Sequence, residues 1–194
     1  MHRKLGLLFA AKGDWDQALE HLAHDIFYAS NEYGTDDIRT SGAYFDMATV
    51  FRHQDRMDIA DDLYDRTTSI WYDHLHRLVQ SICKPPDIPA GIGEVVAEIT
   101  QEEKEKLENE AQEAEAIKVL NTIQEIRFRQ KDIIPELRIR NLVALCMLYF
   151  ILESPIKCRE IVIMLDKITP ICRDKTLIAD AEWMKKNVGN DKTV

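Results

Sequence analysis

The 194-residue sequence is poor in turn-forming residues and in cysteine. It holds seven glycines and six prolines, too few for a β-sandwich or barrel, whose many tight turns use these residues. Its four cysteines, Cys83, Cys146, Cys158 and Cys172, lie far apart, which excludes a zinc ribbon and a small disulfide scaffold. We therefore expect an almost entirely helical chain with free thiols, as in a reducing compartment.

Long apolar segments and excess positive charge are also lacking. The longest apolar run, 142–152, is shorter than the ~20 residues of a membrane-spanning helix. Met1 leads directly into a charged helical pattern, without the apolar core of a signal peptide. The formal net charge of −9 argues against nucleic acid or a membrane as partner. These features predict an intracellular, soluble protein.

The sequence does contain an internal repeat with a period of 42 residues. The residues Leu5, Gly6, Phe9, Trp15, Ala18 and Leu22 recur as Met47, Ala48, Phe51, Met57, Ala60 and Tyr64. Each copy has a small residue in its first half and another in its second, where two helices can approach closely. This pattern is typical of a helical hairpin, so residues 1–83 are predicted to form two such repeats.

Turn and capping residues place the first four helices at about 2–12, 15–32, 36–53 and 57–83. Asp14 and Gln17 have the spacing of a reciprocal N-terminal capping pair. Gly34 is expected to end the second helix in the left-handed conformation, and Thr35, Asp36 and Asp37 offer caps for the third.

The second half of the chain follows a break rich in proline and glycine. Residues 84–99 are predicted to be a linker, 100–131 one long helix whose acidic first half projects, and 188–194 a tail. Residues 134–187 are predicted to be a third hairpin and a capping helix of about 175–187. Within that hairpin, Ser154 should cap a helix that begins at Pro155.

The small, aromatic and bulky residues at these spacings resemble the tetratricopeptide repeat in its lengthened 42-residue form. The segments 5–8, 20–30, 34–44 and 110–120 are similar to the carboxy-terminal repeat region of the zinc-finger MYND-domain-containing protein twelve family. The resemblance implies an accessory subunit of inner-arm dynein in the axoneme of motile cilia and flagella. Its implied partners are an axonemal dynein heavy chain and a second tetratricopeptide protein.

The sequence departs from that family in having no clustered cysteine and histidine ligands before the first repeat. The family's zinc finger is therefore not expected here. The chain also opens inside a repeat helix without capping residues, which predicts a shortened form that lacks upstream repeats.

A solenoid built from these hairpins would line its concave groove with the first helix of each hairpin. The predicted partner-binding residues of that groove are Arg3, Leu7, Phe45, Thr49, Arg52 and Arg140. Arginines among apolar side chains suit an acidic amphipathic helix or an extended segment of a larger protein. The alternative is a cytosolic tetratricopeptide adaptor that binds peptide segments and has no link to cilia.

No catalytic motif is recognisable. The sequence has no glycine-rich phosphate loop, no nucleophile elbow and no dinucleotide fingerprint. His21 and His24 have a spacing that could hold a metal ion if another helix supplied ligands, which leaves a metalloenzyme as a second alternative. The prediction remains a non-enzymatic scaffold without catalytic residues, cofactor or metal.

Overall fold

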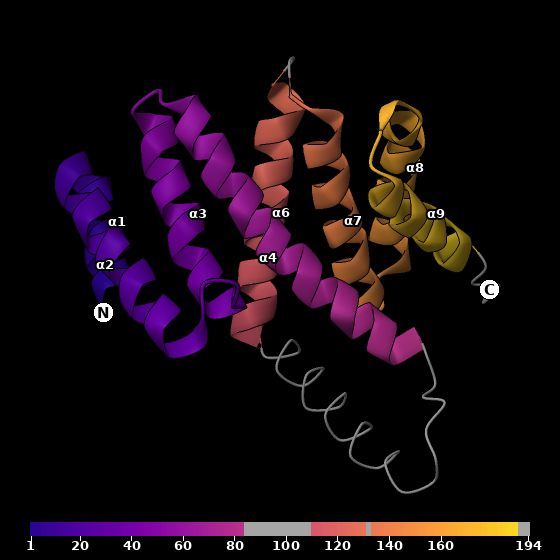
Figure 1. The fold of residues 1–194 in the computed structure, drawn as a ribbon, viewed down its shortest axis with the longest axis horizontal. Coiled ribbons are helices and arrows are strands. Elements are labelled where there is room, and N and C mark those ends of the chain that lie inside the picture. Colours follow the sequence, from indigo (N-terminus) through magenta and orange to yellow (C-terminus); the bar gives the residue numbers. More distant parts are fainter. Residues whose placement is uncertain (84–109, 131–132, 190–194) are drawn as a thin grey trace, which may run out of the picture. The chain divides into compact units, whose positions relative to one another are not determined.

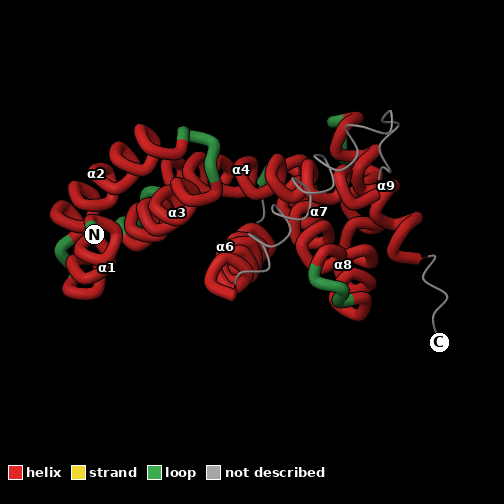
Figure 2. Tube along the Cα trace, turned by 90° about the horizontal axis from the view of Figure 1, so that it is seen from below, coloured by secondary structure: helices red, strands yellow, loops and turns green. Residues whose placement is uncertain are grey.

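A computed structural model describes residues 1–83, 110–130 and 133–189. All of these residues lie in helices or in the loops that join them (Figure 2), which confirms the all-α fold. The chain divides into two compact units, Met1–Trp71 and Tyr72–Val194. The predicted linker 84–99, the acidic start of the predicted long helix and most of the predicted tail lie outside the described residues.

The first unit contains three complete helices and the start of a fourth. These are α1 (His2–Lys12), α2 (Trp15–Tyr33), α3 (Ile38–His53) and α4 (Met57–Cys83). Helix α2 packs against both α1 and α3 (Figure 1). The observed bounds lie within two residues of those predicted from turn and capping residues, so the two predicted hairpins are present.

Small residues of the repeat lie where the helices approach most closely. A Cβ atom placed on Gly6 would lie 2.7 Å from Cγ of Leu22 and 3.2 Å from the Ala18 carbonyl oxygen. The remaining small residues of the two repeats are fully buried: Ala18 in the first copy, and Ala48 and Ala60 in the second. A larger side chain at these positions would push the paired helices apart.

The helical hairpins of both units turn through the same hydrogen-bonded loop. In each, one residue with positive φ follows the first helix: Gly13 (78°), Asp55 (60°) and Glu153 (52°). The next amide in the chain donates to a carbonyl five residues back, from Asp14 to Phe9 and from Ser154 to Tyr149, for example. This is the Schellman arrangement that satisfies the free carbonyl groups at a helix end.

Two predicted end structures differ from the observed ones. The Asp14 carboxylate accepts from the Gln17 amide at 3.3 Å, but the Gln17 side chain donates to Glu20 instead of returning to the cap. Gly34 ends α2 with a positive φ of 100°, as predicted, but its ψ of 158° lies outside the left-handed helical region, so the predicted cap geometry is not formed. The predicted cap on α3 is made by Asp37, whose carboxylate accepts from the Arg39 amide.

The part of the second unit that the structure describes contains the end of α4 and five further elements. These are α6 (Glu110–Arg129), α7 (Pro135–Ile151), α8 (Pro155–Ile168), the short 3₁₀ helix η1 (Thr169–Ile171) and α9 (Lys175–Gly189). Helix α7 packs against α6, α8 and α9 (Figure 1). Every residue from 141 to 149 is buried, so α7 is the centre of this unit.

The α7–α8 hairpin is a third copy of the repeat. Aligning its turn residue Glu153 with Asp55 places Cys146 opposite Ala48 and Cys158 opposite Ala60. Both cysteines are buried, and the Cys158 thiol donates to the Cys146 carbonyl at 3.7 Å. The two cysteines therefore occupy the small-residue positions at which the paired helices approach each other.

Two further boundary details correct the sequence prediction. Helix α8 begins at Pro155 as predicted, but the Ser154 side chain makes no capping hydrogen bond. Val188, placed in the tail by the sequence, is a buried residue of α9, which continues to Gly189. Within the described part of the chain, every helix is too short or too polar to cross a membrane.

Candidate interaction surface and histidine cluster

Two of the predicted groove residues, Arg3 and Phe45, are held in contacts within the protein. The Arg3 guanidinium pairs with the buried Asp46 carboxylate at 2.6 Å, and its backbone amide donates to Asp25. Phe45 is only 5% exposed and packs against the ring of Tyr64. Its prediction as a surface contact is wrong because this face of α3 turns toward α4.

The remaining groove residues are divided between the two units. Thr49 donates to the Phe45 carbonyl and lies 3.3 Å from the Tyr64 hydroxyl, so its polar atom is engaged in the hairpin. Arg52 and Leu7 are exposed, while Arg140 is half-buried on α7 in the second unit. Of the six predicted groove residues, only Leu7 and Arg52 have exposed side chains.

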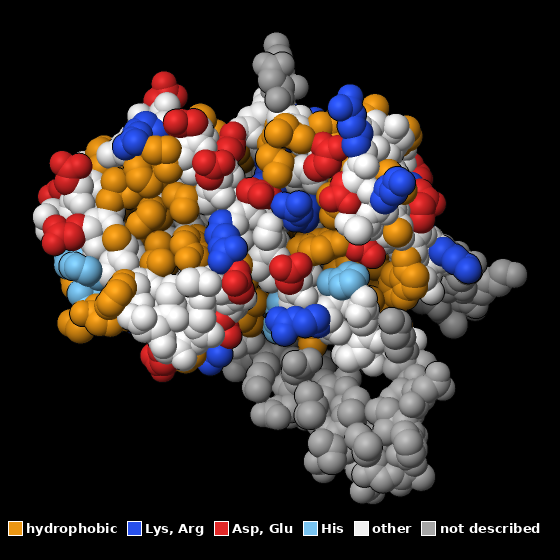
Figure 3. Space-filling view, in the orientation of Figure 1, with side chains coloured by type: hydrophobic (Ala, Val, Ile, Leu, Met, Phe, Trp, Pro, Cys, Tyr) orange, Lys and Arg blue, Asp and Glu red, His pale blue; other side chains and the backbone are white. Residues whose placement is uncertain are grey.

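Exposed apolar side chains gather on α1 and α2 instead. Leu7 and Leu8 on α1 are 45% and 49% exposed, and Phe27 and Tyr28 on α2 are 59% and 57% exposed. Hydrophobic side chains cover much of the first unit on the face drawn in Figure 3. Exposed apolar side chains on packed helices can contact a partner, so we treat these four residues of one hairpin as the candidate interaction surface.

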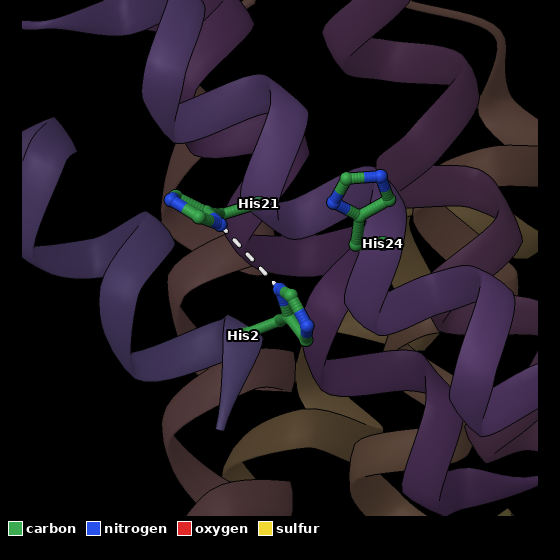
Figure 4. Close-up of side chains that lie close together, drawn as sticks. All are labelled: His2, His21 and His24. Carbon is green, nitrogen blue, oxygen red and sulfur yellow. Dashed lines mark hydrogen bonds between the residues drawn. The ribbon is translucent and has the colours of Figure 1, made fainter.

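Three histidines meet on the same hairpin. His2 at the start of α1 joins His21 and His24 on α2, and ligand nitrogens of the three rings all lie within 4.8 Å of one another (Figure 4). Nδ1 of His2 is 3.4 Å from Nδ1 of His21. We call these three residues the histidine cluster. The sequence pointed to His21 and His24, but His2 was missed because it lies on a different helix.

Neighbouring contacts fix the histidine cluster in place. The His2 ring stacks on Tyr28 with centroids 5.5 Å apart, and the His21 ring stacks on Phe9 at 5.3 Å. The Arg3 amide, next to His2, donates to the Asp25 carboxylate, next to His24, at 3.1 Å. That hydrogen bond holds the start of α1 against α2, so the backbone beneath the three rings is fixed.

A second polar cluster lies in the other unit, between α4 and α9. The Tyr72 hydroxyl donates to Asp180, and Nε2 of His76 is 3.4 Å from the other oxygen of that carboxylate. Burial, then the hydrogen bond to Asp180, raises the pKa of Tyr72 well above its ordinary value. These contacts attach α9 to α4.

The pocket beside this cluster, of about 390 Å³, includes Cys83, His76 and Asp180 in its lining. Cys83 lies two helical turns beyond His76, or ~10 Å along α4, too far for the histidine to take its proton. Burial raises the pKa of Cys83, whereas an activated nucleophile needs a lowered one. This thiol therefore lacks the environment of a catalytic cysteine.

The repeat cysteines have the chemistry of packing residues. The hydrogen bond with Cys158, together with burial, raises the pKa of the Cys146 thiol. Both side chains are buried in the α7–α8 hairpin, so a protonated thiol is the favoured form of Cys146. Cys146 and Cys158 therefore pack in the core of this hairpin.

A scan of the chain against models of known protein families gives no match.

Proposed function

We propose that this protein is a non-enzymatic scaffold for protein–protein interactions, and that it acts as an accessory subunit of inner-arm dynein in the axoneme of motile cilia and flagella. The observation that carries the scaffold role is the candidate interaction surface on the first hairpin. Leu8 and Phe27, for instance, are about half exposed on packed helices. Apolar side chains held this way are suited to burial by a partner.

The repeat architecture supports a helical partner. Helical hairpins that stack side by side bury one another's apolar faces, and an exposed face of a hairpin presents the same kind of surface to another protein. An amphipathic helix that places apolar residues at every third or fourth position fits such a face. Leu7 and Leu8 would then contact the apolar stripe of the partner.

The ciliary part of the proposal depends on the resemblance described from the sequence. The same resemblance gives the partners that we propose, an axonemal dynein heavy chain and a second tetratricopeptide protein. It is carried by residues 5–8, 20–30, 34–44 and 110–120, and the first three segments lie on or beside the helices of the first unit.

The test is to express the tagged chain in a motile ciliated cell and to identify the proteins that co-purify from salt extracts of its axonemes. We expect the dynein heavy chain and a second tetratricopeptide protein. A chain carrying Leu8→Glu and Phe27→Glu should lose them. The matched control carries Ile156→Glu and Ile163→Glu on α8, two residues that are at least as exposed, and should retain them.

The outcomes separate the two parts of the proposal. Absence of the unmodified chain from axonemes would overturn the ciliary role and favour the cytosolic adaptor. Retention of dynein by the Leu8→Glu and Phe27→Glu chain would instead show that the interaction surface lies elsewhere on the molecule.

A further inference from the structure

We propose that His2, His21 and His24 form a binding site for a divalent transition-metal ion of the Zn²⁺ class. Neutral imidazole is the nitrogen ligand that such ions prefer in proteins. The three rings come from two helices and have ligand nitrogens within 4.8 Å of one another. Among the described residues, this is the group of metal-binding side chains that the fold brings together.

The geometry is close to that of a bound ion. Two ligand nitrogens of a tetrahedral Zn²⁺ ion, each ~2.1 Å from the metal, are separated by ~3.4 Å. Nδ1 of His2 and Nδ1 of His21 are 3.4 Å apart. The ligand nitrogen of His24 lies within 4.8 Å of those of His2 and His21, so its exposed side chain must move closer to them to complete three ligands (Figure 4).

In the absence of metal, one of the Nδ1 atoms of His2 and His21 donates its proton to the other. Metal binding replaces this single hydrogen bond with coordination bonds to both nitrogens, and the displaced proton moves to the other nitrogen of its ring or to solvent. The nearby Asp25 carboxylate, fixed by the Arg3 amide, contributes negative charge that favours a cation at this site.

Three protein ligands leave a fourth position for water or for a group from a partner. The site lies on the same hairpin as the candidate interaction surface, and Tyr28 belongs to that surface and stacks on His2. Coordination would also join the start of α1 to α2, because His2 belongs to one helix and the other two ligands to the next. A bound ion should therefore stabilise this hairpin against unfolding.

The test uses the full chain, with any histidine tag removed, stripped of metal and titrated with ZnCl₂ in a calorimeter. We expect binding of Zn²⁺ at one site per chain and a rise in the thermal unfolding midpoint. His21→Gln and His24→Gln should each weaken that binding by at least about tenfold. His24 is exposed, so His24→Gln is expected to fold even if His21→Gln does not.

His53→Gln and Cys83→Ser are the matched controls, since both side chains are exposed and lie outside the histidine cluster. Each should bind Zn²⁺ as the unmodified chain does. Co²⁺ in place of Zn²⁺ should give a visible spectrum of nitrogen ligation without a thiolate charge-transfer band. Absence of Zn²⁺ binding, or binding that His24→Gln leaves unchanged, would overturn the proposal and leave the cluster with an aromatic packing role.

Discussion

The hairpin α1–α2 and the helix α7 show two ways in which this chain stabilises the same repeat. Helix α1 buries only Gly6, and α2 buries only Ala18 and Leu22. Helix α7 buries 11 of its 17 residues. A helix that is buried on most of its surface contributes far more apolar area than one packed along a narrow strip.

Polar contacts partly compensate for the thin core of the first hairpin. The ion pair of Arg3 with Asp46 joins α1 to α3, and the bond from the Arg3 amide to Asp25 joins α1 to α2. Such contacts are individually modest and weaken with exposure and salt. We conclude that the α1–α2 hairpin opens more readily than the second unit, and that the candidate surface and the histidine cluster lie on this less stable part.

The largest expected effect is a change at the centre of the second unit. Leu142→Ala on α7 removes a fully buried side chain and should lower the free energy of unfolding by about 3 kcal/mol. Urea unfolding measures the loss, and hydrogen exchange should increase in α6–α9 but not in α1 or α2. Ile163→Ala, 57% exposed on α8, is the control. An equal increase in the rate of hydrogen exchange in both units would show that they unfold together.

Gly6→Val tests the close approach in the first hairpin. The added side chain meets Leu22 and the Ala18 carbonyl, so we expect a loss of about 2 kcal/mol and faster hydrogen exchange in α1 and α2 alone. Ala11→Val adds similar bulk at an exposed position of α1 and should cost only the difference in helix propensity, about 0.5 kcal/mol. If the two variants behaved alike, α1 would not be held by this contact.

Tyr72→Phe removes the hydrogen bond that attaches α9 to α4. The Asp180 carboxylate loses a donor, and we expect the free energy of unfolding to fall by about 1.5 kcal/mol at neutral pH. The control is Tyr33→Phe, an exposed tyrosine of the first unit. The thermal unfolding of α9, followed separately in peptides from that helix, should reveal the loss of stability. An unchanged unfolding of α9 would contradict the prediction.

The same tyrosine predicts a pH dependence. Because the fold raises the pKa of Tyr72 above its ordinary value of 10.0, the unfolded chain releases the phenol proton first as the pH rises. This stabilisation is complete below pH 10 and is lost as the pH increases beyond it. The difference in stability between the unmodified chain and Tyr72→Phe should therefore shrink when both are unfolded at increasing pH above 10. A constant difference would contradict this assignment.

The smallest expected effects concern the shared turn. Asp55 and Glu153 have positive φ, which costs a residue with a side chain up to about 1 kcal/mol relative to glycine. Asp55→Gly should therefore raise the free energy of unfolding of the first unit by about 0.5 kcal/mol, and Glu153→Gly that of the second unit by the same amount. Each increase would be measured as a higher midpoint of urea unfolding. Gly13→Ala makes the reverse change and should lower it. Destabilisation by both glycine variants would mean that the carboxylates have a role of their own.

Much of the fold could be predicted from the sequence because its signals are local. The period of 42 residues and the turn residues near Gly13 placed α1–α4 within two residues of their bounds. The third hairpin was predicted, but its identity as a further repeat was not, because cysteine replaces the small residues of the earlier copies. The conformation of Gly34 could not be predicted, since the φ that favours glycine is compatible with more than one ψ.

The site was harder to predict because it depends on contacts between helices. Arg3 was placed correctly on α1, but its ion pair with Asp46 spans 43 residues of sequence. Phe45 was assigned to the wrong face of α3, since a rotation of one residue position exchanges a buried side chain for an exposed one. The pair of His21 and His24 was recognised, whereas His2 joins them only through the packing of α1 on α2.

The shared turn also shows how little the geometry of a hairpin depends on the side chain at its turn. Gly13, Asp55 and Glu153 have no side-chain feature in common, yet each is followed by the same backbone hydrogen bond across the helix end. Among the described residues, the 42-residue period covers two of these hairpins, whereas the main-chain hydrogen bond at the turn is present in the α7–α8 hairpin as well. The main-chain hydrogen bonds of the turn therefore allow one hairpin geometry to be built on three different residues.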